Sequence, residues 1–115
     1  MQTVKCINGK ISLIKFDDKH LNLFEHQSSY NPNMPLRGLI YLGRVYDAFA
    51  AKSNLNKYSS TLQKIPTPKY FELYNEIREI PDRMNLRLSD AFVHPDPEAA
   101  LECTAVMLNI NQPPF

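Results

Sequence analysis

A carboxylate and an amide stand two positions apart at the end of a short apolar run, where Glu25 and Gln27 close the segment Leu21–Gln27 (LNLFEHQ). Side chains alternate between the two faces of a strand, so Glu25 and Gln27 would share one face and His26 would point to the other. Oxygen donors of this kind bind hard divalent cations, and a bound cation polarises a phosphodiester and helps to form hydroxide from water. Taken alone, however, so short a pattern favours a solvated strand end.

A second apolar run, Lys10–Phe16 (KISLIKF), precedes this segment and is separated from it by the polar residues Asp17–His20. Two such runs around a short polar loop predict a β-hairpin with a four-residue connection. A hairpin centred between Asp18 and Lys19 places Glu25 opposite Ser12.

The segment Met34–Lys52 is the clearest predicted helix of the chain. Asn33 is suited to cap it, and Pro35 falls in the first turn, where its missing N–H does no harm. Helical spacing predicts one buried face. Its members are Leu36, Leu39, Ile40, Gly43, Tyr46 and Ala50.

Three further extended segments are expected after a polar connection over Ser53–Lys69, with a turn over Glu76–Asp82. The strands are Tyr70–Tyr74, Leu86–Leu88 and Leu101–Ile110, the last of which has little polar content and is predicted to be central. A hairpin, a long helix and further strands predict an α/β fold in which a mixed sheet packs against the helix. The length of 115 residues favours a single domain over residues 1–115.

The net charge of +1 provides no overall attraction to nucleic acid, so any DNA contact must come from a local cluster of basic residues. Arg37 and Arg44 follow the Glu25 segment on the predicted helix and are suited to phosphate, which arginine binds with two parallel donors. The alternative for Arg44 is a surface ion pair with Asp47.

The two cysteines, Cys6 and Cys103, have no zinc-ligand spacing and suggest no disulfide framework. Cys103 lies in an apolar run, which favours a small buried thiol. The sequence contains no apolar stretch long enough to span a bilayer and no signal pattern, so we expect a cytoplasmic protein without a membrane partner.

The segment Leu23–Arg37 (LFEHQSSYNPNMPLR) resembles the Rpn family of recombination-promoting nucleases, also described as YhgA-like transposases. Further matching blocks follow in the family's order, and together they cover roughly residues 10–111. The matching blocks are Lys64–Pro68, Tyr74–Asn75, Pro81–Arg83, Leu86–Phe92 and Val106–Asn111.

The resemblance implies a PD-(D/E)XK restriction-endonuclease-like fold with the long helix after the Glu25-x-Gln27 strand. It also implies Mg²⁺-dependent (or Mn²⁺-dependent) endonuclease activity on DNA, linked to recombination or mobile elements. In this pattern Glu25 is a metal ligand, and Gln27 takes the position usually held by lysine and would orient water or phosphate.

The family's first acidic residue has no counterpart here, since it is expected near Lys10, opposite Gln27 in the hairpin. Asp17 and Asp18 lie at the turn, roughly 23 Å from Glu25 along an extended strand. Lys10 would repel a cation, although it would suit a phosphate. We therefore expect cleavage to be weak or absent, unless an acid such as Glu72 on a neighbouring predicted strand reaches the site.

A second departure is that family members usually begin with a helical segment before the first strand. The chain is therefore expected to be a shortened member of the family. One alternative is a non-catalytic remnant that binds DNA or pairs with a full-length relative. The partners expected for the chain are DNA and a second copy in a homodimer. Another alternative is a structural α/β domain with no role on nucleic acid, which the near-neutral charge favours.

Overall fold

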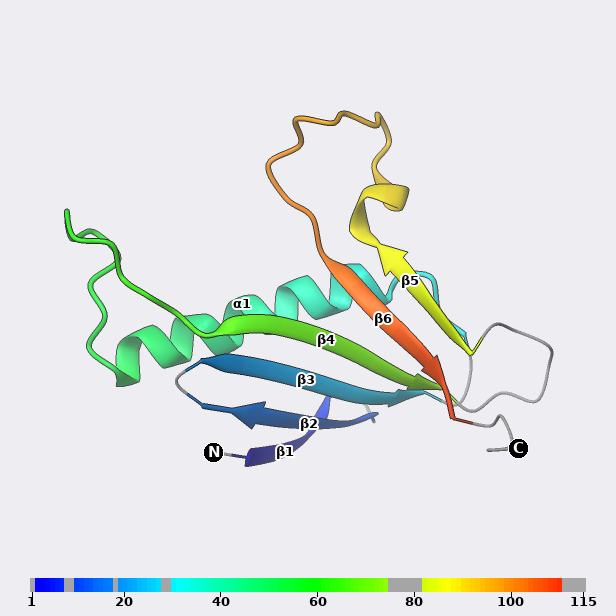
Figure 1. The fold of residues 1–115 in the computed structure, drawn as a ribbon, viewed down its shortest axis with the longest axis horizontal. Coiled ribbons are helices and arrows are strands. Elements are labelled where there is room, and N and C mark those ends of the chain that lie inside the picture. Colours follow the sequence, from blue (N-terminus) through cyan, green and yellow to red (C-terminus); the bar gives the residue numbers. More distant parts are fainter. Residues whose placement is uncertain (1, 8–9, 18, 28–29, 75–81, 111–115) are drawn as a thin grey trace.

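The computed structural model describes residues 2–7, 10–17, 19–27, 30–74 and 82–110; for residues 2–7, 10–12 and 27 it describes the backbone alone. Six strands form one mixed sheet in the order β1-β2-β3-β4-β6-β5, and the helix α1 lies along one face of it (Figure 1). The elements are β1 (Gln2–Ile7), β2 (Lys10–Phe16), β3 (His20–Gln27), α1 (Met34–Lys52), β4 (Thr67–Tyr74), β5 (Arg83–Arg87), the short 3-10 helix η1 (Leu88–Ala91) and β6 (Thr104–Asn109). The predicted α/β arrangement of a mixed sheet and one long helix is confirmed.

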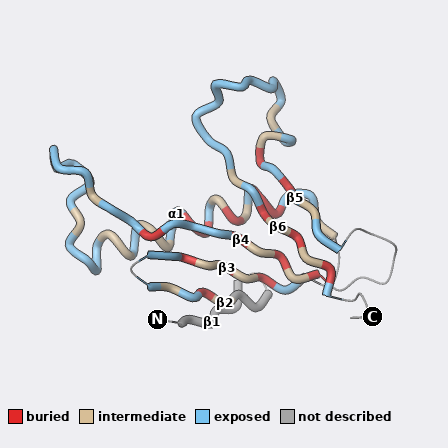
Figure 2. The backbone as a smooth tube through the Cα atoms, viewed as in Figure 1, coloured by how far each residue is buried: buried red, intermediate tan, exposed pale blue. Residues whose placement is uncertain are grey.

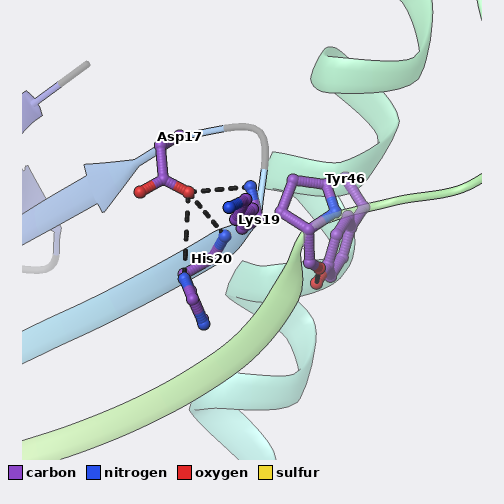
Figure 3. Close-up of polar contacts among 5 residues, drawn as sticks. Asp17, Lys19, His20 and Tyr46 are labelled. Atoms are coloured by element: carbon purple, nitrogen blue, oxygen red, sulfur yellow. Dashed lines mark hydrogen bonds and ion pairs between the residues drawn. The ribbon is translucent and has the colours of Figure 1, made fainter.

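The predicted hairpin is formed by β2 and β3, which pair antiparallel with Ser12 opposite Glu25. The turn is stabilised by the Asp17 carboxylate, which accepts hydrogen bonds from the backbone N–H of Lys19 at 2.8 Å and of His20 at 2.7 Å (Figure 3). Such a carboxylate bond to the backbone two residues on is the usual reason for aspartate in turns. The first strand, β1, pairs antiparallel with β2 and was not expected from the sequence.

Helix α1 begins and ends where the sequence predicts. Pro35 lies in the first turn, but the Asn33 side chain makes no capping hydrogen bond. At the other end Asn54 has a positive φ of 56°. The backbone N–H of Leu55 bonds to the carbonyl of Ala50 at 2.9 Å, an arrangement in which a left-handed residue satisfies the last carbonyls and ends the helix.

The buried face of α1 differs from the predicted one. Leu36 and Ile40 are 49% and 48% exposed, and Gly43 is exposed. The buried positions are Met34, Pro35, Gly38, Tyr41 and Leu42. Gly38 explains the difference, because its missing side chain lets the helix lie directly on the ring of Tyr70. Apolar residues occupy a wide arc of this helix, so their spacing alone did not identify the face that meets the sheet.

Strand β4 crosses back after α1 and pairs parallel with both β3 and β6, and β5 completes the sheet antiparallel to β6. The prediction of a central last strand is confirmed, although β6 begins at Thr104 rather than Leu101. The predicted extended piece Leu86–Leu88 divides between β5 and η1. Most of the predicted turn Glu76–Asp82 lies outside the described residues.

The core lies between α1 and the face of the sheet that it covers, where buried residues alternate with partly exposed ones along β3, β4 and β6 (Figure 2). In β4, for example, Tyr70, Glu72 and Tyr74 are buried, whereas Phe71 and Leu73 between them are partly exposed. The alternation follows from the pleat of the strand, which sends successive side chains to opposite faces.

Helix α1 is also tied to the chain that leads into β4. The half-buried Tyr46 donates a hydrogen bond from its hydroxyl to the backbone carbonyl of Pro66 at 2.5 Å (Figure 3). Pro66 is fully buried beside the start of β4. This contact holds the C-terminal half of α1 against the chain that leads into β4. The Gly38–Tyr70 contact holds the N-terminal half of α1 against β4 itself.

Candidate functional site

Two glutamates lie side by side in the buried face of the sheet, beneath α1. Glu25 of β3 and Glu72 of β4 are direct neighbours in the parallel pairing of the two strands. Glu25 is 3% exposed and Glu72 is 0% exposed. Both residues occupy positions whose side chains lie on the face of the sheet covered by α1. Neighbouring strands are only about 4.8 Å apart. Two carboxyl groups are therefore held next to each other in an environment with little water.

Burial and neighbours decide the charge of Glu72. Loss of solvation raises the pKa of this carboxyl to about 8, and the negative charge of Glu25 and a hydrogen bond between the two carboxyl groups raise it as well. The hydroxyl of Tyr70 donates a hydrogen bond to Glu72 Oε2 at 2.6 Å, which lowers the pKa, as does the positive charge of Arg37. The raising effects win, so in this fold Glu72 is protonated at neutral pH.

Arg37, in the first turns of α1, supplies the positive charge of the site. Its Nη2 lies 3.4 Å from Glu25 Oε2, and its Nη1 contacts the sulfur of Met34 at 3.3 Å. The Arg37 side chain is 26% exposed, so one side of the guanidinium faces Glu25 and another faces solvent. Arg37 is thus the part of the site that an external ligand can reach.

Two buried oxygens near Glu25 have no hydrogen-bond donor or acceptor among the residues that the structure describes when both glutamates are ionised: Glu72 Oε1 and the hydroxyl of Tyr41. Tyr41 lies one turn after Arg37 on α1, and its pKa is raised first by burial and then by the charge of Glu25. Buried polar atoms normally have partners, so each exception requires an explanation such as an ion or a water. We refer to Glu25, Glu72, Tyr70, Arg37 and Tyr41 as the Glu25–Glu72 cluster.

The structure brings together two of the predicted site residues, Glu25 and Arg37. Gln27 lies at the end of β3 opposite Tyr74, and Lys10 lies at the start of β2, but their side chains are outside the described part of the structure. Arg44 is exposed, and among the described residues no hydrogen bond or ion pair joins it to the cluster, in contrast to Arg37. His26 is exposed and lies on the opposite face to Glu25, as strand alternation predicts.

The carboxyl group next to Glu25 comes from β4, beneath α1, and not from the β2–β3 hairpin. Asp17 is engaged in the hairpin turn, as expected, while Glu72 lies next to Glu25. The only feature of the sequence that pointed to Glu72 as a site residue was its position in a predicted strand, between two tyrosines that the structure shows to be buried. The missing information was the pairing of that strand with β3, which short-range patterns do not specify.

The donor set is small. Within the described residues no group of three or more histidine, cysteine, aspartate or glutamate side chains is positioned to hold a metal ion. Mg²⁺, however, is commonly bound through one or two carboxylates together with waters and substrate phosphates. The two carboxyl groups and the unpartnered Glu72 Oε1 therefore fit an oxygen-binding cation of this class, once Glu72 has lost its proton.

The described part of the chain has no helix that is both long and apolar enough to cross a membrane. Comparison with known proteins found no family model, no curated protein and no solved structure that matches this chain.

Proposed function

We propose that this chain is a Mg²⁺-dependent nuclease-like domain of the PD-(D/E)XK type that binds DNA and cleaves it weakly. The observation that carries the proposal is the contact between Glu25 and Arg37 beside Glu72. It places a carboxylate suited to a metal next to a guanidinium suited to a phosphate. The resemblance of Leu23–Arg37 to recombination-promoting nucleases supports the same reading and suggests a role in recombination or mobile elements.

Each side chain has a separate task in this proposal. A bound divalent cation would supply Lewis-acid polarisation of the phosphodiester. Glu25 and Glu72 would hold this cation. Arg37, which is partly exposed, would bind a phosphate and so bring the DNA backbone next to the buried glutamates. Gln27 would orient water or phosphate, as the resemblance implies.

Weak cleavage follows from the electrostatics of the site. Arg37 already neutralises Glu25, and Glu72 keeps its proton at neutral pH because its pKa is raised to about 8. A cation must therefore displace both a proton and a guanidinium before it is held by two carboxylates. Metal binding that releases protons becomes stronger as the pH rises. We expect any nicking activity to increase between pH 7 and pH 9.

The test is cleavage of supercoiled plasmid with Mg²⁺ or Mn²⁺ at pH 7, 8 and 9. Glu25→Ala and an EDTA control should both abolish nicking, and Glu98→Ala, a change at an exposed glutamate distant in sequence from the site, should not. Nicking that persists in Glu25→Ala would contradict the assignment. Circular dichroism of each variant shows whether loss of activity reflects loss of fold.

A non-catalytic DNA-binding remnant is the second candidate, and the balanced charge of the cluster favours it. With Glu72 protonated and Glu25 paired with Arg37, the site needs no metal to be stable. A gel shift that survives EDTA, from folded protein that nicks no plasmid at any of the three pH values, would establish this function. Sedimentation in the same buffer would show whether two copies bind together.

A further inference from the structure

We propose that Glu72 is the second carboxylate ligand of a divalent cation bound between β3 and β4, with Glu25 as the first. This inference rests on the proposed function and deepens it, because it names the group that completes the metal site. The acid would come from the strand after the helix rather than from the hairpin strand that precedes Glu25.

Strand pairing provides the geometry. Glu25 and Glu72 are direct partners across parallel strands, on the same face and near the C-terminal ends of both. Their backbones are therefore separated by one interstrand spacing of about 4.8 Å, and both side chains project from the sheet toward α1. Carboxylate oxygens at this separation can converge on one ion at the 2.0–2.6 Å distances that Mg²⁺ and Ca²⁺ require.

Two buried oxygens, one of which belongs to the carboxylate pair itself, give a second reason to expect a ligand. When both carboxyl groups are ionised, Glu72 Oε1 has no hydrogen-bond donor among the described residues, although the side chain is fully buried; only the protonated Glu72 shares a hydrogen bond with Glu25. The hydroxyl of Tyr41, whose pKa is raised by burial and by the charge of Glu25, also has no hydrogen-bond partner among the described residues. An unpartnered buried oxygen costs about 1–3 kcal/mol, and an ion with its bound water would satisfy both atoms.

The charges of the cluster leave room for one more cation. Two ionised carboxylates carry two negative charges, and Arg37 supplies one positive charge. The remaining charge must be neutralised by a proton or by a metal ion, since adjacent carboxylates do not both ionise in a buried site without compensation. All the available donors are oxygens, which select hard cations such as Mg²⁺, Mn²⁺ and Ca²⁺ over zinc.

Arg37 is not an obstacle to this occupancy. Its contact with Glu25 Oε2 is 3.4 Å, longer than the 2.7–2.9 Å of a strong charge-assisted hydrogen bond. Because the side chain is partly exposed, it can turn toward solvent without leaving the surface of the protein. A metal ion between the glutamates would release Arg37 from Glu25 and leave it free to contact a phosphate.

The experiment is titration of the purified chain with Mn²⁺ at pH 8, with free Mn²⁺ measured by its electron paramagnetic resonance signal. Glu72→Gln keeps the shape of the side chain and should weaken binding roughly tenfold or more, since even loss of a ligand's outer partner costs 10–100-fold. Glu25→Gln should do the same, and Glu98→Gln should bind as the wild type does. Equal Mn²⁺ affinity of Glu72→Gln and wild type would overturn the inference.

The outcomes separate this inference from the proposed function. If binding is lost in Glu25→Gln but unchanged in Glu72→Gln, Glu25 binds metal without Glu72; the proposed function survives and the inference fails. If the wild type binds no Mn²⁺, or if neither variant changes its affinity, both fail. Loss of binding in both variants with no plasmid nicking would support the metal site and contradict the nuclease activity.

A wild-type measurement keeps the test valid if a variant does not fold. Substoichiometric Mn²⁺ broadens the amide signals of residues near it in the ¹H–¹⁵N spectrum. We expect the signals of Glu25, Glu72 and Tyr41 to broaden first. Earlier broadening at Asp90, Asp96 and Glu102, which line a separate acidic hollow, would place the ion elsewhere and overturn the inference.

Discussion

Tyr70 and Glu72 stand two residues apart in β4 and share one buried hydrogen bond, in which the tyrosine hydroxyl donates to Glu72 Oε2 at 2.6 Å. The pair shows how one strand both builds the core and carries a polar site. The ring of Tyr70 fills the space left by Gly38 on α1, while its hydroxyl satisfies one oxygen of a fully buried carboxyl group. Tyr70 therefore contributes both to the packing of α1 on the sheet and to the pKa of Glu72.

The stability of the metal-free protein should fall as the pH rises from about 5 to about 8. The folded state raises the pKa of Glu72 to about 8 from an ordinary value of 4.5, so between these values the folded chain holds a proton that the unfolded chain has released. Binding more protons in the folded state makes the free energy of unfolding decrease with pH, here by on the order of a few kcal/mol, and level off above pH 8.

Thermal unfolding in EDTA across this pH range measures the effect. Glu72→Gln, which cannot ionise, should lose most of the pH dependence in this window, whereas Glu98→Gln should keep it. The groups that face Glu72 are Tyr70 from its own strand, Glu25 from β3, and Arg37 from α1. An unchanged slope in Glu72→Gln would show that a different group is responsible.

Tyr70→Phe should destabilise the protein by about 1–3 kcal/mol, because it leaves Glu72 Oε2 buried without its donor. The same change should raise the pKa of Glu72 further, since the tyrosine hydrogen bond lowers it. Denaturant unfolding at pH 6 gives the first quantity, and the pH dependence of the melting temperature gives the second. Tyr58→Phe, at a tyrosine that is 87% exposed, is the matched control and should leave both unchanged.

Arg37→Met should destabilise the fold by about 1–3 kcal/mol, because Glu25 would remain buried without its cationic partner. Arg44→Met is the matched control on the same helix, since Arg44 is exposed and such changes are usually within about 0.5 kcal/mol. Chemical unfolding of the two variants side by side makes the comparison. Equal stability of the two would show that the Glu25–Arg37 contact contributes nothing to the fold.

DNA binding gives a separate readout for Arg37. If its guanidinium binds one phosphate, Arg37→Met should weaken binding to all sequences alike and reduce the slope of log affinity against log salt by about one. Fluorescence anisotropy with a labelled duplex, at salt concentrations from about 25 to about 200 mM, measures this slope, because phosphate contacts weaken strongly over that range. A slope equal to that of the wild type would remove Arg37 from the DNA contact.

Gly38→Ala should destabilise the protein by about 1–3 kcal/mol, because the added methyl group would overlap the ring of Tyr70 and force the helix away from the sheet. The ring cannot move aside easily, since it is 2% exposed and its hydroxyl is bonded to Glu72. Gly43→Ala, where a methyl group meets open space, should instead stabilise the helix by about 0.5–1 kcal/mol. Melting temperatures that shift in the same direction for both would contradict the packing described for Gly38.

The local features of the fold were predictable because they depend on short stretches of sequence. The hairpin register that pairs Ser12 with Glu25 followed from the position of the polar turn, and the bounds of α1 followed from Pro35 and the run of helix-forming residues. Strand alternation also placed His26 away from Glu25.

The long-range features were not predictable in the same way. Which face of α1 is buried depends on the fit between Gly38 and Tyr70, two residues far apart in the chain. The approach of Glu72 to Glu25 depends on β4 pairing with β3 in one register. A shift of that register by one residue would turn Glu72 to the opposite face, and nothing in either segment alone specifies the alignment.

The parallel pairing of β3 with β4 also sets when the site can exist during folding. The hairpin of β2 and β3 closes locally and can form early, but β3 and β4 meet only after the whole helical crossover has closed. Until then Glu25 and Glu72 belong to separate, hydrated segments, and neither burial nor a neighbouring carboxylate raises the pKa of Glu72. A newly made or partly unfolded chain therefore has no paired acids, and the site arises as a late product of tertiary assembly.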